Sequence, residues 1–293
     1  MIQEKSFWNR LFDVSNYFFI LSITLLALIP LVHVLSVSLS TPSAATGGYV
    51  TFWPIGFSLN AYEAIFKTQS VFRAFIISVE RTVFGTILSM FLTVITAYPL
   101  SKTPHELKGR NIFIWIFVFT MLFNGGMIPR FMVIRNLGLL NTIWALILPG
   151  AISVWNIILM MNFFKEVPKE LEEAAILDGA SPWQVLWKVV FPLSLPALAT
   201  LALFTAVWHW NSWFDGMIYM TNSANYPLQT YLRTVVIQMN NVTLNVNATD
   251  VAKLSNRSLH AAMIFVTTLP ILVVYPFLQR YFVSGIKLGA VKG

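Results

Sequence analysis

The sequence predicts an all-α integral membrane protein with six membrane-spanning helices. Of its 293 residues, 57% are hydrophobic and 11% are charged, whereas a soluble globular domain carries about 25% charged residues. The mean hydropathy is +0.70, so too few charged side chains remain to cover a folded surface of this size in water. Most of that surface is therefore expected to face lipid.

Six apolar stretches are long enough to serve as spans, because a hydrocarbon core about 30 Å thick requires about 20 apolar helical residues. They are Tyr17–Leu39, Phe75–Pro99, Ile112–Ile128, Thr142–Phe163, Leu193–Phe214 and Ala261–Val283. The first follows Lys5 and Arg10, as a cleaved signal peptide would, but its length favours an uncleaved anchor. We expect one membrane domain over residues 17–284, a cytoplasmic segment over 1–16 and a cytoplasmic tail over 285–293.

The distribution of basic residues predicts that both termini lie in the cytoplasm. With that orientation, eleven Lys and Arg residues fall in inside segments and seven in the longer outside segments, as the positive-inside rule requires. The net charge of +7 is therefore explained by the membrane, and we expect no nucleic-acid partner. Cysteine is absent, which excludes disulfides and thiolate metal sites. The four histidines are not spaced as metal ligands, and no metal site is expected.

The loop between the fourth and fifth spans, residues 166–192, carries an unusual concentration of acidic residues. Five of the twelve acidic residues of the chain fall within thirteen positions: Glu166, Glu170, Glu172, Glu173 and Asp178. Pro168 is suited to the start of a helix, and glutamates that follow it are stabilised at the positive end of the helix dipole. Gly179 is a natural helix stop. A short acidic helix is therefore predicted.

A second short helix is predicted directly after Gly179. In the sequence Ser181–Gln184, serine is an N-cap, proline the first helical residue and glutamine the third residue of a capping box. Apolar residues follow at helical spacing: Trp183, Leu186, Trp187 and Val190. The residues alone leave two interpretations open. The pair of helices is either a solvated connection, as runs of charge usually are, or a docking element.

Residues Glu173–Ala180, continued through Val189–Pro192, resemble the EAA loop of permease subunits in binding-protein-dependent ABC importers. The pattern is E-A-A, three residues, G, nine residues and I-x-L-P. Its spacing matches throughout, with Val189 in place of Ile and Phe191 in place of Leu. Three further segments are similar to the carbohydrate-uptake branch: Ala97–Tyr98, His209–Phe214 and Gly285–Gly293. Within this branch the chain resembles the second permease subunit, similar to that of the maltose importer and closer to the polysaccharide and oligouronide group, which includes the alginate importer.

The resemblance implies a type I ABC importer permease fold, with a coupling helix that fits a groove on an ATPase subunit. The residues implied for this contact are Glu173, Ala174, Ala175, Asp178, Gly179, Ser181, Pro182 and Trp183. Glu173 would pair with a basic residue of the ATPase, and Gly179 would allow the bend. The implied partners are a homologous second permease, two ATPase subunits that bind ATP and Mg²⁺, and an extracytoplasmic solute-binding protein. The sequence has no G-x-x-x-x-G-K-[ST] loop, so this subunit is expected to be non-catalytic and to hold no cofactor.

The end of the fifth span is rich in aromatic and polar side chains. Sugar C–H faces pack on aromatic rings while sugar hydroxyls form hydrogen bonds, so such residues suit a sugar path. The candidates are Trp208, His209, Trp210, Asn211, Trp213 and Asp215. The tryptophans also fit an aromatic belt at the membrane interface, and both interpretations stay open. His209 and Asn211 favour an inward, polar role, because lipid penalises polar groups.

Two more candidates for the substrate path follow the third span. They are Asn124 at its end and Arg130 beyond it. Arginine attracts an anionic sugar, although ordinary solvation of a loop explains Arg130 as well.

Glu80 and Arg81 lie within the second span, where ionisable groups normally face the interior of the helix bundle. Adjacent residues point about 100° apart on a helix, so each is expected to have its own partner. We favour a buried network that holds the helices together over a role in translocation.

The external loop, residues 215–257, is predicted to contain an amphipathic helix over Pro227–Gln238 that lies at the membrane surface. Its apolar face comprises Leu228, Tyr231, Leu232 and Val235. By the resemblance, this loop contacts the solute-binding protein.

These features predict the permease subunit of an ATP-driven ABC importer in the cytoplasmic membrane of a bacterium. Its substrate is expected to be an oligosaccharide, and the resemblance indicates an acidic one such as alginate or an oligouronide. One alternative is an ABC permease for a non-sugar solute. Another is a stand-alone secondary transporter or channel, which is expected to show an intramembrane ion-coupling site. Glu80 alone is a poor candidate for such a site.

Overall fold

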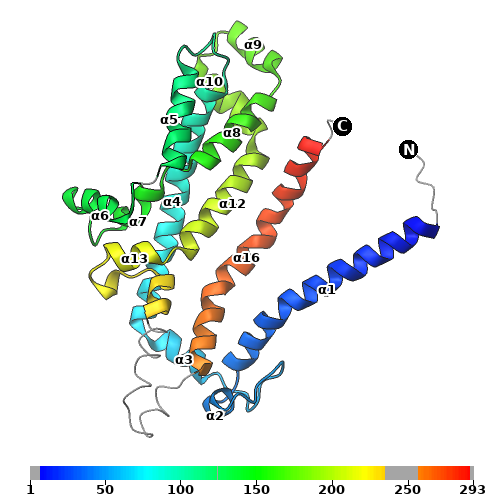
Figure 1. Cartoon of the computed structure of the whole chain (residues 1–293), viewed down its shortest axis with the longest axis vertical. Coiled ribbons are helices and arrows are strands. Elements are labelled where there is room, and N and C mark those ends of the chain that lie inside the picture. The colour runs from blue at the N-terminus through cyan, green and yellow to red at the C-terminus, as the bar shows by residue number, and fades with distance from the viewer. Residues whose placement is uncertain (1–6, 124, 235–256, 291–293) are drawn as a thin grey trace. The chain divides into compact units, whose positions relative to one another are not determined.

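The structure is a computed structural model that describes residues 7–123, 125–234 and 257–290. Within these ranges every regular element is a helix and no strand is present (Figure 1). The prediction of an all-α protein is therefore confirmed. The described residues divide into two compact units, one drawn from Met1–Gln69 and Thr234–Leu269, the other from Ser70–Arg233 and Pro270–Gly293.

The first unit begins with α1 (Phe7–Ser38), an apolar helix of 32 residues. This is longer than the roughly 20 residues that a span requires. Its large apolar side chains from Phe7 to Val32 are exposed in the isolated chain. Because such a surface is unfavourable in water, α1 is suited to contact with lipid or with apolar helices of a partner.

Short helices and serine hydroxyls complete the first unit. The helices are α2 (Pro42–Thr46), α3 (Asn60–Lys67) and the first part of α16 (Arg257–Ala290). The Ser258 hydroxyl donates to the Ser40 carbonyl at 3.0 Å, which joins the start of α16 to the end of α1. Such bonds satisfy backbone carbonyls that a helix end leaves without partners.

Four helices lie side by side in the second unit (Figure 1). They are α4 (Gln69–Ser101), α5 (Arg110–Leu122), α8 (Val154–Glu166) and α12 (Leu195–Asn211). Their shared core is apolar and includes Val94, Ala97, Met160, Phe164, Leu186 and Leu201. Because lipid is as apolar as these side chains, van der Waals packing among them is what holds the helices together in a membrane.

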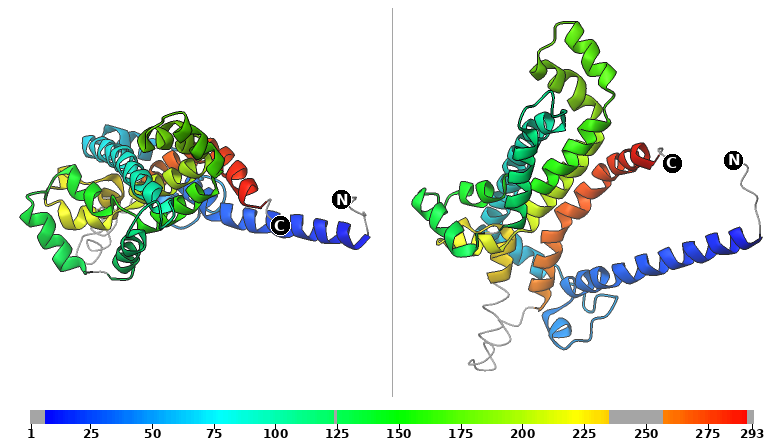
Figure 2. Two further views of the ribbon diagram at one scale, coloured as in Figure 1. Left: turned by 90° about the horizontal axis from the view of Figure 1, so that it is seen from above. Right: turned by 45° about the horizontal axis from the view of Figure 1, so that its top comes forward.

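Shorter helices gather at the two ends of this second unit (Figure 2). At one end lie α9 (Lys169–Leu177), α10 (Pro182–Val185), η2 (Leu186–Val190) and α11 (Phe191–Leu193). At the other lie α6 (Met127–Asn136), α7 (Ile143–Ile147), η1 (Leu148–Gly150), α13 (Phe214–Tyr219), η3 (Ser223–Asn225) and a helical segment over 228–234. The acidic loop and the aromatic region, which the sequence analysis places on opposite sides of the membrane, thus occupy opposite ends of one unit.

Up to six membrane spans are present in the described part of the chain, but only three of them are straight. Helices α1, α4 and the first 18 residues of α16 are each long and apolar enough to cross a membrane. Three pairs of consecutive helices, each bent by more than 40° at a short break, bring the number to six if each pair is one span. The predicted span Thr142–Phe163 is bent by 53° and the chain leading into α12 by 81°. Prolines near each bend lack the N–H that a continuous helix requires. The first bend interrupts the predicted fourth span between Gly150 and Val154, whereas the second lies at the start of the predicted fifth span and leaves α12 continuous from Leu195 to Asn211.

The third predicted span, Ile112–Ile128, is also interrupted. Helix α5 ends at Leu122, and α6 begins at Met127. The candidate Asn124 lies outside the described residues. The predicted domain limits at residues 16 and 284 stay predictions.

Helices α4 and α12 approach each other closely at Gly85. A Cβ atom built on this glycine would lie 2.5 Å from Nε2 of His209, whose ring is buried. Real Cβ contacts are never so short, so any larger residue at position 85 must displace a rigid aromatic ring.

Replacing Gly85 with alanine is expected to lower stability by about 1–3 kcal/mol because of this overpacking, although alanine normally stabilises a helix relative to glycine. The melting temperature of the detergent-solubilised protein measures the effect. Gly125→Ala is the matched control, since nothing lies within 4 Å of a Cβ at that position. Equal melting temperatures for both variants would contradict the close packing.

Candidate functional site

The acidic loop folds as the two short helices that the sequence predicts. Helix α9 ends at Leu177, and Gly179 has a φ of +84°, a conformation that glycine adopts at little cost. The Ser181 amide donates to Oε1 of Gln184 at 2.8 Å, and the Gln184 amide donates to Oγ of Ser181 at 3.4 Å. The predicted capping box is therefore confirmed. One detail differs, because Pro168 precedes α9 as its N-cap and not as its first residue.

Helices α9 and α10 expose large apolar side chains beside acidic ones. Leu177 is 88% exposed, and Ile176 and Trp183 are each 57% exposed. Glu173 is exposed on the same short helix. A solvated connection has no reason to expose large apolar residues together, whereas a protein interface does. This surface supports the docking interpretation. We call α9 and α10 together the coupling element.

The inner side of the coupling element is packed on the second unit. Val185 and Leu186 belong to the buried core of that unit. The rings of Trp183, Trp187 and Phe191 form a row, with centroids 5.5 Å and then 4.9 Å apart. These contacts make the coupling element a rigid extension of the spans.

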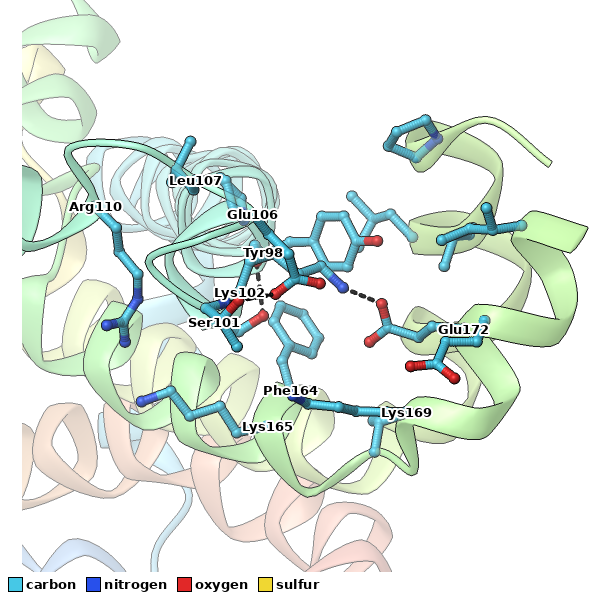
Figure 3. Close-up of a pocket in the computed structure, with 18 of the residues that line it drawn as sticks. Tyr98, Ser101, Lys102, Glu106, Leu107, Arg110, Phe164, Lys165, Lys169 and Glu172 are labelled. Carbon is cyan, nitrogen blue, oxygen red and sulfur yellow. Dashed lines mark hydrogen bonds and ion pairs between the residues drawn. The ribbon is translucent and has the colours of Figure 1, made fainter. Parts of the chain in front are cut away.

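An ion pair fastens α9 to the end of α4 (Figure 3). The Lys102 ammonium donates to Oε2 of Glu172, and the two side chains are only 20% and 13% exposed. The ammonium nitrogen also lies 4.3 Å from the centroid of the Tyr98 ring, a distance at which the ring attracts a cation. These residues line a cavity of about 820 Å³. The partial burial makes this pair stronger than an exposed one.

The connection between α4 and α5, beside this ion pair, is stabilised by hydrogen bonds within itself. The hydroxyl and the amide of Thr103 donate to Oε2 of Glu106 at 2.6 and 2.7 Å. These two bonds lower the pKa of the Glu106 carboxyl, and the bond from the hydroxyl has the larger effect. The reason is that hydrogen bonds to a carboxylate favour its charged form. The Ser101 end of α4 is therefore held by local bonds as well as by Glu172.

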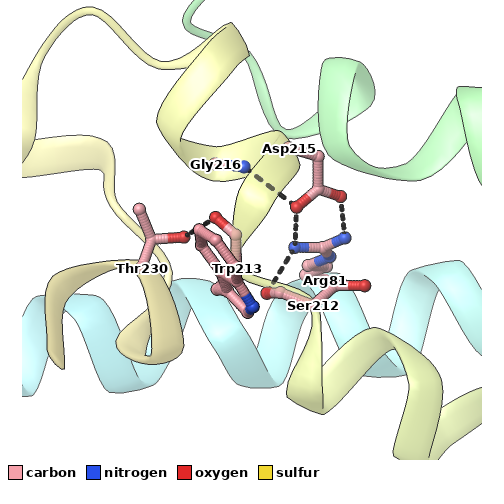
Figure 4. A network of polar contacts seen from close by, with 6 residues as sticks. All are labelled: Arg81, Ser212, Trp213, Asp215, Gly216 and Thr230. Carbon is pink, nitrogen blue, oxygen red and sulfur yellow. Dashed lines mark hydrogen bonds and ion pairs between the residues drawn. The ribbon is translucent and has the colours of Figure 1, made fainter. Parts of the chain in front are cut away.

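A second ion pair is formed by Arg81, which lies inside α4, in the half of the helix that begins at Gln69 (Figure 4). Arg81 is 0% exposed, and its guanidinium donates to both carboxylate oxygens of Asp215, with the Nη1–Oδ1 distance at 3.1 Å. The same Nη1 donates to the Ser212 carbonyl at 3.1 Å. The prediction that Arg81 has its own partner and joins helices is confirmed. The buried network predicted for Glu80 is wrong, because Glu80 is exposed and takes part in none of the three ion pairs found in the described part of the chain.

A cavity of about 640 Å³ opens beside this second ion pair, and we call it the outer cavity. The path candidates that line it are Arg130, Trp208, Asn211, Trp213 and Asp215. His209 and Trp210 do not line it. Both are buried, with Trp210 in edge contact with Phe75 at 5.9 Å. The turn of about 100° per residue in α12 separates them from Trp208 and Asn211.

The tryptophans of the outer cavity are held in place by their neighbours. A Cβ on Gly150 would lie 2.4 Å from the Trp208 ring, so the glycine allows that ring to sit against η1. The guanidinium of Arg233 lies 4.1 Å from the Trp213 ring centroid. The hydroxyl of Thr230 donates to the Trp213 carbonyl at 2.7 Å. Two aromatic surfaces are thus fixed at the cavity wall.

Asn141 is a structural residue that the sequence analysis missed. Its φ of +62° lies in a region that asparagine tolerates better than most residues. Its side-chain Oδ1 accepts from the backbone amides of Thr221 and Asn222 at 2.7 and 3.1 Å. Its backbone amide donates to the Tyr219 carbonyl at 3.0 Å. These bonds join the segment after α6 to the end of α13. The only sequence signal was an asparagine three residues after Gly138, which predicts a turn and not its partners.

The helix predicted to lie at the membrane surface is instead packed into the second unit over its described part, 228–234. Leu228 is buried, and its amide donates to Oγ of Ser78 on α4 at 2.7 Å. The first amides of a helix need acceptors, and a serine of α4 supplies one here. The remainder of Pro227–Gln238 lies outside the described residues.

Residues 74–288 match the family described as binding-protein-dependent transport system inner membrane component. This chain belongs to that family. The permease is 42% identical over 291 residues to the polygalacturonan/rhamnogalacturonan transport system permease protein YtcP of Bacillus subtilis (strain 168), covering 97% of this chain and 99% of that one. It is 41% identical over 285 residues to Protein LplC of the same organism, covering 97% and 96%.

The fold of the permease is shared with a solved structure. A chain in the crystal structure of a bacterial ABC transporter involved in the import of the acidic polysaccharide alginate matches with a TM-score of 0.84 and 36% identity, covering 94% of this chain and 98% of that one. The type I permease fold and the location in the inner membrane, both expected from the sequence, are therefore confirmed.

Replacing Lys102 with methionine is expected to loosen α9, because it leaves the carboxylate of Glu172 partly buried and unpaired, at a cost of about 1–3 kcal/mol. Hydrogen exchange of the α9 amides in the solubilised permease should then be about 5- to 100-fold faster. The double variant Lys102→Glu/Glu172→Lys should recover most of the protection. Lys108→Met, at an exposed lysine of the same connection, serves as control, and equal exchange in Lys102→Met and Lys108→Met would exclude the fastening role.

Proposed function

We propose that this permease is one of two homologous membrane subunits of an ATP-driven importer that carries an acidic oligosaccharide into a bacterial cell. Both termini then lie in the cytoplasm. The observation that carries the proposal is the coupling element, which exposes large apolar side chains and is fixed to the spans by buried Val185 and by the Glu172–Lys102 ion pair. The two Bacillus relatives and the alginate transporter chain support the class of substrate.

The energy for transport comes from partner subunits. The sequence lacks a phosphate-binding G-x-x-x-x-G-K-[ST] loop, so two ATPase subunits bind ATP and Mg²⁺. A solute-binding protein delivers the oligosaccharide from outside. In this proposal the ATPase groove receives Leu177, Ile176 and Trp183, while Glu173 meets a basic residue of the ATPase. The remaining residues of the contact, Ala174, Ala175, Asp178, Gly179, Ser181 and Pro182, shape the bend.

The two ion pairs of α4 define how a displacement of the coupling element reaches the outer cavity. Movement of α9 is passed to the inner end of α4 through Glu172 and Lys102. Helix α4 is continuous from Gln69 to Ser101, and in its first half Arg81 holds Asp215. A helix of this length moves as a rod, since its backbone hydrogen bonds are internal. Closure of the ATPases is thereby converted into a rearrangement around the outer cavity.

The competing functions make different demands on the structure. A secondary transporter needs an ionisable group that exchanges a proton or cation within the spans. Arg81 is already neutralised by Asp215, and Glu80 belongs to none of the three ion pairs in the described residues. An importer of a peptide or polyol would share the coupling element and differ only in substrate.

Glu173→Lys and Gly179→Pro are each expected to abolish uptake into membrane vesicles and to reduce co-purification of the ATPase subunits at least tenfold. The first reverses the charge at the docking surface. The second is incompatible with a φ of +84°, because proline requires about −65°. Glu166→Lys makes the same charge change outside the coupling element and should behave as wild type. Normal uptake by both test variants would remove the coupling role.

The assembled transporter in proteoliposomes is expected to hydrolyse ATP faster with binding protein and oligogalacturonate than with binding protein and neutral maltodextrin, by about fivefold or more. The reason is that charge-assisted bonds to a carboxylate are about twice as strong as neutral ones. The rate of phosphate release measures the response. Stimulation by maltodextrin alone would refute an acidic substrate, and stimulation by peptides or polyols alone would select the non-sugar alternative.

A further inference from the structure

The outer cavity combines two aromatic surfaces with Arg130, a lining cation that belongs to no ion pair in the described residues. We propose that it binds one uronate residue of the oligosaccharide, with the guanidinium of Arg130 on the uronate carboxylate and the rings of Trp208 and Trp213 against the sugar. This inference rests on the proposed import of an acidic oligosaccharide. It assigns selection for the uronate carboxylate to Arg130.

The size of the cavity suits a sugar residue. Its volume of about 640 Å³ lies within the range of roughly 300–1,000 Å³ typical of small-molecule sites. Trp208 is 49% exposed, so a large part of its ring is available. Gly150 and Arg233 fix the two rings, which means that little side-chain freedom is lost on binding. A preformed aromatic wall of this kind packs on the C–H face of a pyranose.

The charges that line the cavity leave one cation unmatched. The carboxylate of Asp215 is bound on both oxygens by Arg81 and accepts the Gly216 amide at 2.9 Å. That carboxylate therefore does not repel an anion. Arg130 is exposed and belongs to none of the three ion pairs in the described residues. A guanidinium presents paired N–H donors that match a carboxylate, and an uncharged sugar would leave it without this partner.

The backbone that carries Arg130 is held in position. Phe131, the next residue, stacks on Tyr219 with ring centroids 6.4 Å apart at an angle of 15°. The bonds of Asn141 to Thr221 and Tyr219 join the same region to α13. Arg130 and the Trp213 ring are thus connected to one framework. On the cavity wall, Asn211 donates one N–H to the Val207 carbonyl at 3.0 Å, and its amide oxygen is oriented by that bond to accept from a sugar hydroxyl.

The test measures uptake of trigalacturonate by proteoliposomes that contain the complete transporter, with binding protein at saturating concentration. Arg130→Gln is expected to lower the rate about tenfold or more, since it removes a charge-assisted hydrogen bond. Arg130→Lys keeps the charge without the paired donors and should give an intermediate rate. Arg135→Gln is the matched control, because Arg135 is an exposed arginine of the same helix that does not line the cavity. ATP hydrolysis without substrate should be equal in all four proteins.

Each outcome of this experiment has one meaning. A normal rate for Arg130→Gln, or an equal loss in Arg135→Gln, overturns the uronate site while the proposed import of an acidic sugar stands. A wild-type transporter that takes up no trigalacturonate but does take up a neutral oligosaccharide overturns the acidic substrate and the site with it. Loss of basal ATP hydrolysis in Arg130→Gln alone shows that Arg130 serves assembly and also overturns the site.

Discussion

The pairing of Arg81 with Asp215 is the constraint on which the functional half of this permease depends. A guanidinium with no exposed surface inside a membrane helix is unfavourable unless its donors are used. Here Nη1 and Nη2 donate to the Asp215 carboxylate, and Nη1 also donates to the Ser212 carbonyl just after α12, whereas Nε has no hydrogen-bond partner among the described residues. These bonds join α4 to the turn between α12 and α13. They also place the wall of the outer cavity against α4.

One ion pair lies directly after α4 at Lys102 and another lies inside the first half of α4 at Arg81, and this arrangement links two chemically different sites. Lys102 meets the acidic coupling element, and Arg81 meets the aromatic outer region. Both pairs are shielded from solvent, so salt weakens them less than it weakens exposed pairs. The apolar contacts between α4, α8 and α12 do not by themselves fix how these helices are oriented, because apolar burial is non-directional. Directed contacts of Arg81 and Lys102 are what relate the position of one site to that of the other.

The exposed apolar surfaces of the chain indicate where it needs neighbours. Helix α1 exposes large apolar side chains along most of its length, as expected for contact with lipid or with helices of a homologous subunit. The coupling element exposes a smaller apolar patch beside carboxylates, which is the composition of a protein interface and not of a lipid-facing surface. Two different kinds of partner are therefore indicated by two different surfaces.

The sequence by itself determined the helical class, the existence and approximate limits of the spans, and the coupling element with its capping box and glycine bend. These are local properties, since hydropathy, N-caps and the conformations open to glycine act within a few residues. It also predicted that Arg81 would be buried and paired. Only the tertiary structure decided that the partner is Asp215, 134 residues away, that Asn141 joins α13, and that His209 and Trp210 lie away from the cavity that Trp208 and Trp213 line. These outcomes depend on which helix faces which, and that is set by long-range packing and side-chain geometry that no local pattern records.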